Sequence, residues 1–82
     1  MAQLIRTPKQ LGTAIHNARS RRGLTQQALA DLVGTGQKTV SRIENGHDGT
    51  RLDTLFAIVA MLELDLQLGP RSKSGKDISE IF

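Results

Sequence analysis

Three side chains that can hydrogen-bond to the edges of DNA base pairs lie within one stretch of six residues: Gln37, Lys38 and Arg42. A glutamine amide can bind the N6 and N7 atoms of adenine, and a lysine or arginine can bind O6 and N7 of guanine. Val40 and Ile43 are spaced to form the inner face of a short helix over residues 37–45, which leaves the three polar side chains on its outer face. This arrangement is typical of a helix that enters the major groove of DNA.

Three further polar side chains are placed to contact the phosphate backbone of such a DNA: Gln26, Thr39 and Ser41. Thr39 and Ser41 lie on the same expected helix as the base-reading candidates. Gln26 opens an expected helix over residues 26–33, and the free backbone N–H groups at a helix N-terminus attract phosphate. The alternative is a helical hairpin whose polar face is simply solvated.

The segment GTGQKT superficially matches a nucleotide-binding loop. A phosphate-binding loop requires the pattern G-x-x-x-x-G-K-[ST] between a strand and a helix. Here Gln37 replaces the second glycine, Leu32 stands where the first belongs, and the preceding segment is expected to be helical. A dinucleotide-binding G-x-G-x-x-G pattern fails at Thr39, and nothing resembles a nucleophile–base pair or paired catalytic carboxylates. We therefore expect neither a nucleotide site nor an enzyme.

Two helices joined by a tight turn must hold the candidate side chains in place. Thr25 is a suitable N-cap for the helix over residues 26–33, and Gly34 supplies the turn that ends it. Ala30 is small where the two helices would cross closely. The residues expected to face inward on the first of these helices are Leu29, Leu32 and Val33. The whole stretch from Gln26 to residue 45 fits a helix-turn-helix.

Another helix is expected on each side of this pair. Thr7 and Pro8 begin the first, Gln10 completes a capping box, and Gly23 can end it. Thr50 and Asp53 have the spacing of a second capping box and predict the start of the last helix. The core stripe expected on this last helix is Leu52, Leu55, Phe56, Val59 and Leu62. Its other residues, through 61, leave almost no polar face, which implies burial against a partner chain.

The apolar period changes from 3.6 to 2 after the last helix. Leu64, Leu66 and Leu68 alternate with polar residues, which predicts a short strand that stops at Gly69. Because a lone strand has unpaired backbone groups, we expect it to pair with the same strand of a second copy across a two-fold axis. The alternatives are a longer last helix or a loose extended segment. The expected fold class is therefore all-α, a compact bundle of four to five helices with one short C-terminal β-strand that pairs across a homodimer.

Length and composition are consistent with this reading. The 82 residues allow one small domain, expected over residues 1–70, and residues 71–82 are expected to form a flexible tail. There is no cysteine, and His16 and His47 lack metal-ligand spacing, so we expect no metal and no cofactor. No apolar run is long enough to cross a membrane, and we expect a cytoplasmic protein. The net charge is +3, and most Lys and Arg residues lie in the first half of the chain, which makes this half a candidate for facing a polyanion; an ordinary solvated surface is the equal alternative.

The segment RGLTQQALADLVGTGQKTVSRIENG resembles the helix-turn-helix of the Xre/Cro family of phage-type repressors. The similarity covers roughly residues 8–64 and implies a lambda-repressor-like fold. It places Gln37, Lys38 and Arg42 at base-reading positions and Gln26 at a phosphate-contact position. It also implies a structural salt bridge between Arg19 and Glu44. Gly36 departs from the pattern, because a Ser or Thr often caps the recognition helix there.

A narrower resemblance covers TPKQLGTAIHNAR, TLFAIVAMLELDLQL and the apolar end of the tail, which are similar to HipB-type antitoxins. This resemblance implies a homodimeric repressor that binds double-stranded DNA at an inverted-repeat operator. It further implies a HipA-type serine/threonine kinase toxin as partner, and repression of the operon that encodes both. A stand-alone regulator without a toxin and a protein-interaction module that no longer binds DNA remain alternatives.

Overall fold

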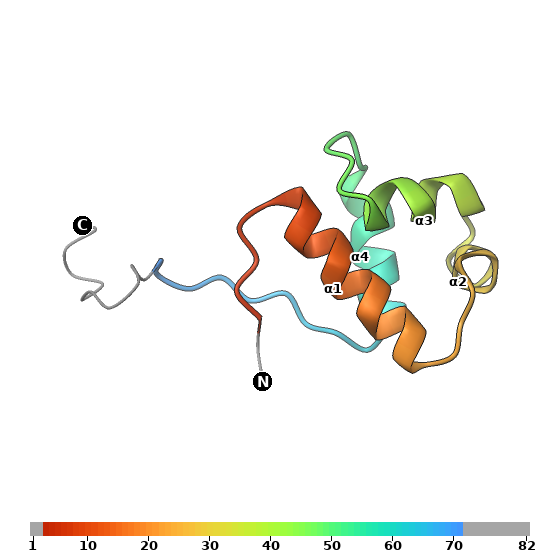
Figure 1. Ribbon diagram of the computed structural model, residues 1–82, viewed down its shortest axis with the longest axis horizontal. Helices are drawn as coiled ribbons and strands as arrows, with labels where there is room; N and C mark the ends of the chain where they lie inside the picture. The colour runs from red at the N-terminus through yellow and green to blue at the C-terminus, as the bar shows by residue number, and fades with distance from the viewer. Residues whose placement is uncertain (1–2, 72–82) are drawn as a thin grey trace.

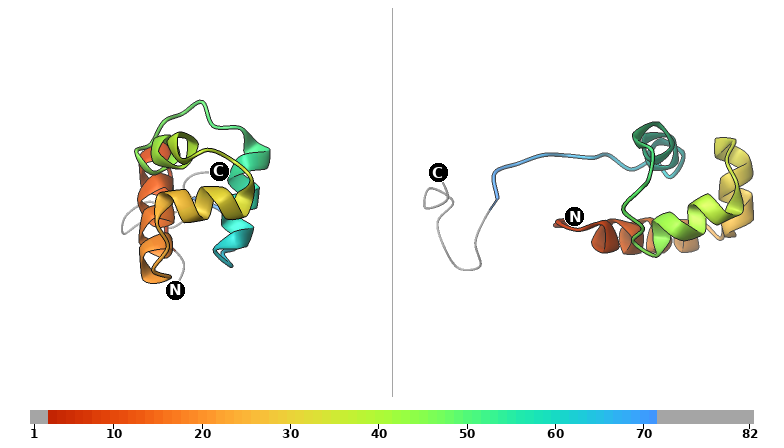
Figure 2. Two further views of the ribbon diagram at one scale, coloured as in Figure 1. Left: turned by 90° about the vertical axis from the view of Figure 1, so that its right-hand side faces the viewer. Right: turned by 90° about the horizontal axis from the view of Figure 1, so that it is seen from above.

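Within residues 3–71, which the computed structural model describes, the chain forms four helices. They are α1 (Pro8–Arg21), α2 (Gln26–Val33), α3 (Gln37–Glu44) and α4 (Leu52–Met61). Figure 1 shows α3 following α2 across a short turn, with α1 and α4 packed beside them. In the left view of Figure 2, α1 and α4 form the two sides of the domain and α2 crosses between them.

Local capping interactions set the helix ends where the sequence predicts them. The Thr7 hydroxyl accepts from the Gln10 backbone N–H at 3.1 Å, and the Thr25 hydroxyl accepts from the Ala28 N–H at 3.0 Å. The Gln10 side chain reaches back to the backbone N–H of Arg6 rather than to that of Thr7. Gly34 has a φ of 79°, the left-handed conformation that ends a helix and that only glycine adopts without strain.

Every helix contributes one large, fully buried side chain to the core: Ile15, Leu29, Val40 and Ile58. The other buried apolar residues surround these four and are Ala18, Ala30, Ile43, Leu55, Val59 and Leu62. The inner face predicted for α3, which consists of Val40 and Ile43, is thus confirmed. The core holds α2 and α3 at a fixed angle, which is the condition for presenting α3 to a partner.

The predicted inner faces of α2 and α4 are wrong in part. Leu32, Leu52 and Phe56 are 54%, 67% and 54% exposed, although all three were expected in the core. Ile58 is buried instead, and the core stripe of α4 continues from Leu55 through Leu62. Because α4 is apolar on nearly every side, its sequence pattern does not distinguish the face that meets this domain from the faces that do not.

The capping box predicted at the start of α4 is also wrong. The N-cap is Arg51, and no side chain caps the helix. The Thr50 hydroxyl donates instead to the carbonyl of His47 at 3.4 Å, and both Asp53 oxygens accept from the Arg51 guanidinium at 3.0 and 2.8 Å. Asp53 therefore pairs with the charged side chain of Arg51 and does not form the reciprocal cap that the spacing predicts.

No strand occurs within residues 3–71 of the single chain, and residues 64–71 have no regular secondary structure. Leu64, Leu66 and Leu68 are 38%, 45% and 103% exposed. A strand needs a neighbouring strand to pair its backbone groups, and the described residues of the single chain offer none. Pairing with a second copy therefore stays a proposal. The expected tail falls almost wholly in residues 72–82, outside the described part of the chain. Among the described residues, no helix combines the length and hydropathy needed to cross a bilayer.

Candidate nucleic-acid interface

The turn between α2 and α3 is fixed by a single carbonyl. The Ala30 carbonyl accepts from the backbone N–H groups of Gly34 and Thr35, both at 2.9 Å, and Ala30 itself is fully buried. Gly36 is the N-cap of α3, and because glycine has no side chain it makes no side-chain cap. The first residue of α3 is Gln37, as predicted. Bonds to one buried residue of α2 thus fix the turn that leads into α3.

The outer side of α3 carries the predicted base-reading side chains. Lys38 and Arg42 are exposed, and neither has an ion-pair partner among the described residues. Gln37, Thr39 and Ser41 are half-buried, and the Ser41 hydroxyl accepts from the Asn45 amide at 3.4 Å. Two cations without local counter-charges therefore project from the exposed face of a helix held rigidly by the core, which suits an anionic partner.

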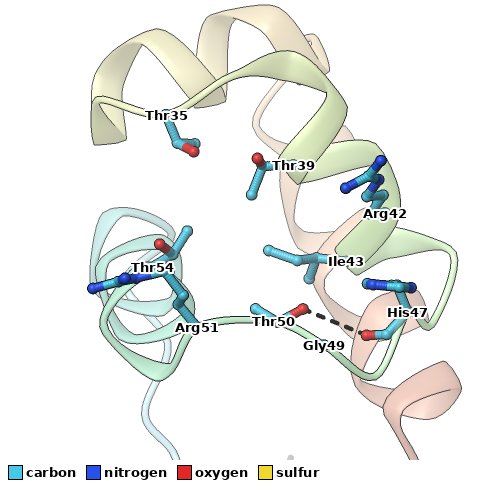
Figure 3. Close-up of a pocket in the computed structure, with 9 residues that line it drawn as sticks. All are labelled: Thr35, Thr39, Arg42, Ile43, His47, Gly49, Thr50, Arg51 and Thr54. Atoms are coloured by element: carbon cyan, nitrogen blue, oxygen red, sulfur yellow. Dashed lines mark hydrogen bonds between the residues drawn. The ribbon is translucent and has the colours of Figure 1, made fainter.

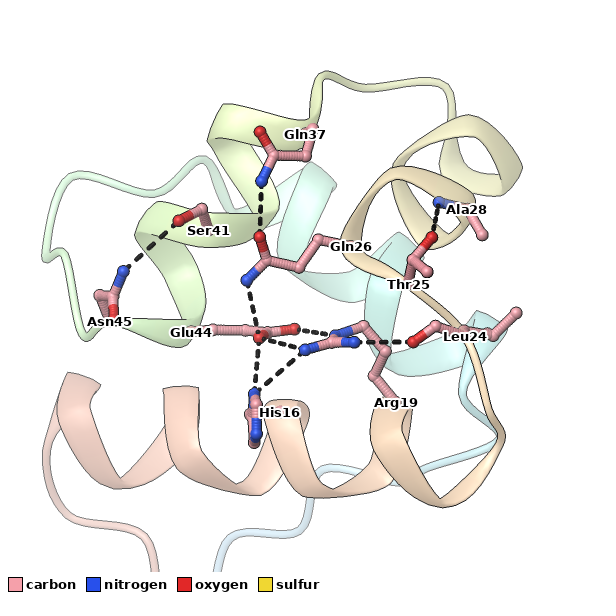
Figure 4. A network of polar contacts seen from close by, with 10 residues as sticks. All are labelled: His16, Arg19, Leu24, Thr25, Gln26, Ala28, Gln37, Ser41, Glu44 and Asn45. Carbon is pink, nitrogen blue, oxygen red and sulfur yellow. Dashed lines mark hydrogen bonds and ion pairs between the residues drawn. The ribbon is translucent and has the colours of Figure 1, made fainter.

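The structure brings together two glutamines that the sequence analysis treated separately. The Gln37 amide nitrogen donates to Oε1 of Gln26 at 2.6 Å, and the Gln26 nitrogen donates to Oε1 of Glu44 at 3.1 Å (Figure 4). Because an amide nitrogen carries two N–H groups, Gln37 keeps one N–H and its carbonyl oxygen for another partner. Those are the two groups that bidentate binding to adenine needs.

A buried ion pair lies directly behind the glutamines. Arg19 and Glu44 are each 9% exposed, and Arg19 donates from Nε to Glu44 Oε2 at 2.6 Å and from Nη2 to Oε1 at 3.0 Å. Its Nη1 donates to the carbonyl of Leu24 at 2.7 Å. The expected structural salt bridge is therefore confirmed, and it ties α1, the α1–α2 connection and α3 together. His16, which the sequence analysis considered only as an unsuitable metal ligand, also contacts Glu44, at 2.9 Å from Nδ1 to Oε1.

These contacts determine the ionisation of Glu44. Burial by itself raises the pKa of Glu44, but hydrogen bonds from Arg19, Gln26 and His16 outweigh it and hold the pKa below 4.5. The hydrogen bond to Glu44 in turn raises the pKa of Arg19. Both members of the pair thus stay charged at neutral pH inside the fold.

The lowered pKa predicts a loss of stability in acid. A carboxyl whose folded pKa lies below its unfolded pKa stabilises the fold above the unfolded value, and this contribution disappears as the pH falls through the folded value. We expect the free energy of unfolding to decrease as the pH is lowered below about 4.5, the ordinary value for Glu44. Urea denaturation at a series of pH values would measure it. The decrease should be smaller in Glu44→Gln, and parallel profiles for the two proteins would contradict the assignment.

A polar cleft of about 210 Å³ opens between α3 and the start of α4 (Figure 3). Its lining combines hydroxyl groups with the side chains of Arg42, His47 and Arg51. Hydrogen bonds from Arg51 lower the pKa of the exposed Asp53 carboxyl to about 2, so the guanidinium of Arg51 is already paired. Arg42 is the lining cation that stays available. The sequence does not predict this cleft, because Thr50 is expected to take part in a helix cap.

Known proteins resemble this chain in sequence and in fold. A family model described as helix-turn-helix matches residues 15–68 of the chain. Antitoxin HipB of Escherichia coli strain K12 is 37% identical over 78 residues, which cover 95% of this chain and 89% of HipB. This chain belongs to the helix-turn-helix family of HipB-type antitoxins. Membership of a family of DNA-binding regulators also confirms that it is not an enzyme.

Solved structures of HipB extend the similarity to the fold. In a HipA–HipB–O2–O3 complex, the matching chain is 41% identical with a TM-score of 0.76, over 83% of this chain and 96% of that one. The same identity, TM-score and coverage hold for a HipB–O4 20-mer complex. The resemblance drawn from the sequence is therefore confirmed, and the four helices described above form a HipB-like helix-turn-helix fold.

Proposed function

We propose that this chain is an antitoxin that represses transcription by binding operator DNA as a homodimer, and that it also binds a HipA-type kinase toxin from the same operon. The observation that carries the proposal is the outer face of α3, where Lys38 and Arg42 project without ion-pair partners among residues 3–71, beside a glutamine held in place by a buried carboxylate. The similarity to HipB in complexes with O4 and with HipA supports both partners.

Each side chain has a distinct role in this proposal. Lys38 and Arg42 bind guanine edges, and Gln37 binds adenine through the carbonyl and the N–H that its bond to Gln26 leaves available. Hydroxyls of Thr39 and Ser41 contact phosphate. Gln26 contacts phosphate with its remaining N–H and also orients Gln37. The residues assigned to DNA are thus Gln26, Gln37, Lys38, Thr39, Ser41 and Arg42.

The operator should be an inverted repeat. A dimeric helix-turn-helix protein places its two recognition helices about 34 Å apart, so the half-sites should lie roughly one helical turn apart. Binding should weaken steeply with salt, because each neutralised phosphate releases counterions. A mobility-shift titration with an inverted-repeat operator and with scrambled DNA tests DNA binding, and co-purification with the kinase tests the toxin contact.

Arg42→Ala should reduce the preference for operator over random DNA. Losing one bidentate guanine contact costs about 1–3 kcal/mol, which is roughly a 5- to 150-fold weakening of operator binding. Fluorescence anisotropy with labelled operator and random duplexes would measure both affinities. Arg21→Ala is the matched control, because Arg21 is an exposed arginine at the end of α1 rather than on α3. Equal operator affinity of Arg42→Ala and the wild type would refute the assignment of Arg42.

The homodimer in this proposal is formed by the segment after α4 together with the exposed apolar side of that helix. Leu64, Leu66 and Leu68 pair as a strand with the same segment of the second copy, while Phe56 and Leu52 supply apolar surface close by in the sequence. Exposed leucines at alternate positions support this interface, because they would be buried together on one side of a two-stranded ribbon.

Leu66→Pro should convert the dimer into a monomer. Proline removes a backbone donor from the centre of the proposed strand, while the four helices end before this residue. Light scattering would report the mass, and circular dichroism would show that the helices persist. Leu66→Val, which keeps β propensity, should remain dimeric. A dimeric Leu66→Pro variant would argue against strand pairing.

A further inference from the structure

A continuous chain of polar contacts connects an exposed residue of α1 with a proposed base-reading residue of α3 (Figure 4). His16 Nδ1 lies 2.9 Å from Glu44 Oε1, the Gln26 nitrogen donates to the same oxygen at 3.1 Å, and the Gln37 nitrogen donates to Gln26 Oε1 at 2.6 Å. His16 and Gln37 are the two ends of this chain. Neither local sequence nor helix periodicity links them.

The chemistry of Glu44 gives this chain a direction. An ionised carboxylate only accepts hydrogen bonds, so Gln26 must turn its nitrogen toward Glu44 and its oxygen away. That oxygen can only accept, so Gln37 must turn its own nitrogen inward. The carbonyl oxygen of Gln37 is then left facing outward. A buried negative charge thereby determines which atoms Gln37 presents to a base pair.

His16 affects this series of hydrogen bonds because it can compete with Gln26 for one oxygen atom, Oε1 of Glu44. Oε1 of Glu44 faces three donors, from Arg19, Gln26 and His16, whereas a carboxylate oxygen has two lone pairs. His16 Nδ1 also lies 3.1 Å from Nη2 of Arg19, which can only donate. When Nδ1 carries a proton it donates to Glu44 and competes with Gln26. When Nδ1 carries none it accepts from Arg19 and leaves the oxygen to Gln26.

We propose that His16 is a positioning residue for DNA recognition, which acts through Glu44 and Gln26 on the orientation of Gln37. This inference rests on the proposed function, because it requires that Gln37 reads a base pair. The His16 side chain is 52% exposed, so it can be replaced without opening a hole in the core. Its effect should therefore be seen in base preference rather than in folding.

A double-mutant cycle between the ends of the chain tests this inference. The proteins are the wild type, His16→Leu, Gln37→Ala and the double variant, and the measurement is the dissociation constant for operator DNA and for operators changed one base pair at a time. The pair read by Gln37 is the one at which Gln37→Ala loses discrimination. Because leucine cannot compete with Gln26 for Oε1 of Glu44, we expect His16→Leu to raise discrimination at that pair by at least about twofold, the lower end of coupling between groups in one hydrogen-bond network. In the Gln37→Ala background, His16→Leu should change nothing.

Three controls make the outcome decisive. His16→Asn, which retains a polar group near the position of Nδ1, should return the discrimination part of the way to the wild-type value, and Ser20→Ala, at another exposed position of α1, should leave it unchanged. Thermal unfolding should confirm that all variants are folded. An equal effect of His16→Leu with and without Gln37 would overturn the inference while leaving the proposed function intact. If the wild type itself fails to prefer operator over random DNA, the proposed function falls, and this inference with it.

Discussion

Replacing Glu44 with alanine is expected to lower the free energy of unfolding by about 3–5 kcal/mol, because it leaves a buried arginine without its counter-charge. Arg19 is 9% exposed and directs two of its donors at Glu44. Without the carboxylate, those donors have no equivalent acceptor, and the bond from Gln26 is lost as well. Urea denaturation monitored by circular dichroism would measure the change.

The exposed ion pair between Arg22 and Glu63 provides the matched control for this experiment. Arg22→Ala also breaks a contact between α1 and the end of α4, but both partners are solvent-exposed. Exposed pairs contribute about 0–1 kcal/mol, so this variant should be nearly as stable as the wild type. If the two variants lost equal stability, burial would not be what makes the Arg19–Glu44 pair important.

Gly12→Ala is expected to destabilise the domain even though alanine favours helices. A Cβ atom at Gly12 would lie 2.4 Å from the carbonyl oxygen of Ile43 and 2.6 Å from that of Glu44. Both are backbone atoms that no rotamer change can move, so α1 and α3 would have to separate. Overpacking of this kind costs about 1–3 kcal/mol or more, which opposes the gain of about 1 kcal/mol that alanine brings to a helix interior. Gly12→Ala should therefore lower the free energy of unfolding, although alanine has the higher helix propensity.

Thermal unfolding of Gly12→Ala and Gly36→Ala would separate crowding from backbone effects. A Cβ at Gly36 meets no atom within 4 Å, and the φ of Gly36 is −92°, which other residues adopt freely. The loss at this N-cap should be no more than about 1 kcal/mol. A Gly12→Ala variant at least as stable as the wild type would show that the α1–α3 crossing adapts easily. Because Glu44 lies at that crossing, such a result would also weaken the case for a rigid polar network.

Most of the helix boundaries could be predicted because their causes are local. Thr7 and Thr25 cap backbone groups three residues away, and Gly34 ends α2 because glycine has no Cβ and adopts positive φ without strain. The exception at α4 has a comparable explanation, since the ion pair between Arg51 and Asp53 displaces the predicted cap. Short-range rules hold where no stronger neighbour competes for the same group.

The candidate site was predicted as a set of residues but not as a connected structure. Lys38 and Arg42 lie on the exposed side of α3, as helical spacing requires. The bond from Gln37 to Gln26 and the contact of His16 with Glu44 join residues 11 and 28 positions apart. No periodicity relates positions so far apart, because the angle between α2, α3 and α1 is set by the core and not by any one helix.

The sequence by itself determined the four helices, the helix-turn-helix and the face of α3 that carries Gln37, Lys38 and Arg42, since period and capping act within a few residues. Only the tertiary structure decided which side of α4 is buried, because an almost wholly apolar helix offers several equivalent stripes and packing selects one. It also decided that a buried carboxylate on α3 receives Arg19, His16 and Gln26, because such a carboxylate gathers whatever donors the packed helices bring within reach.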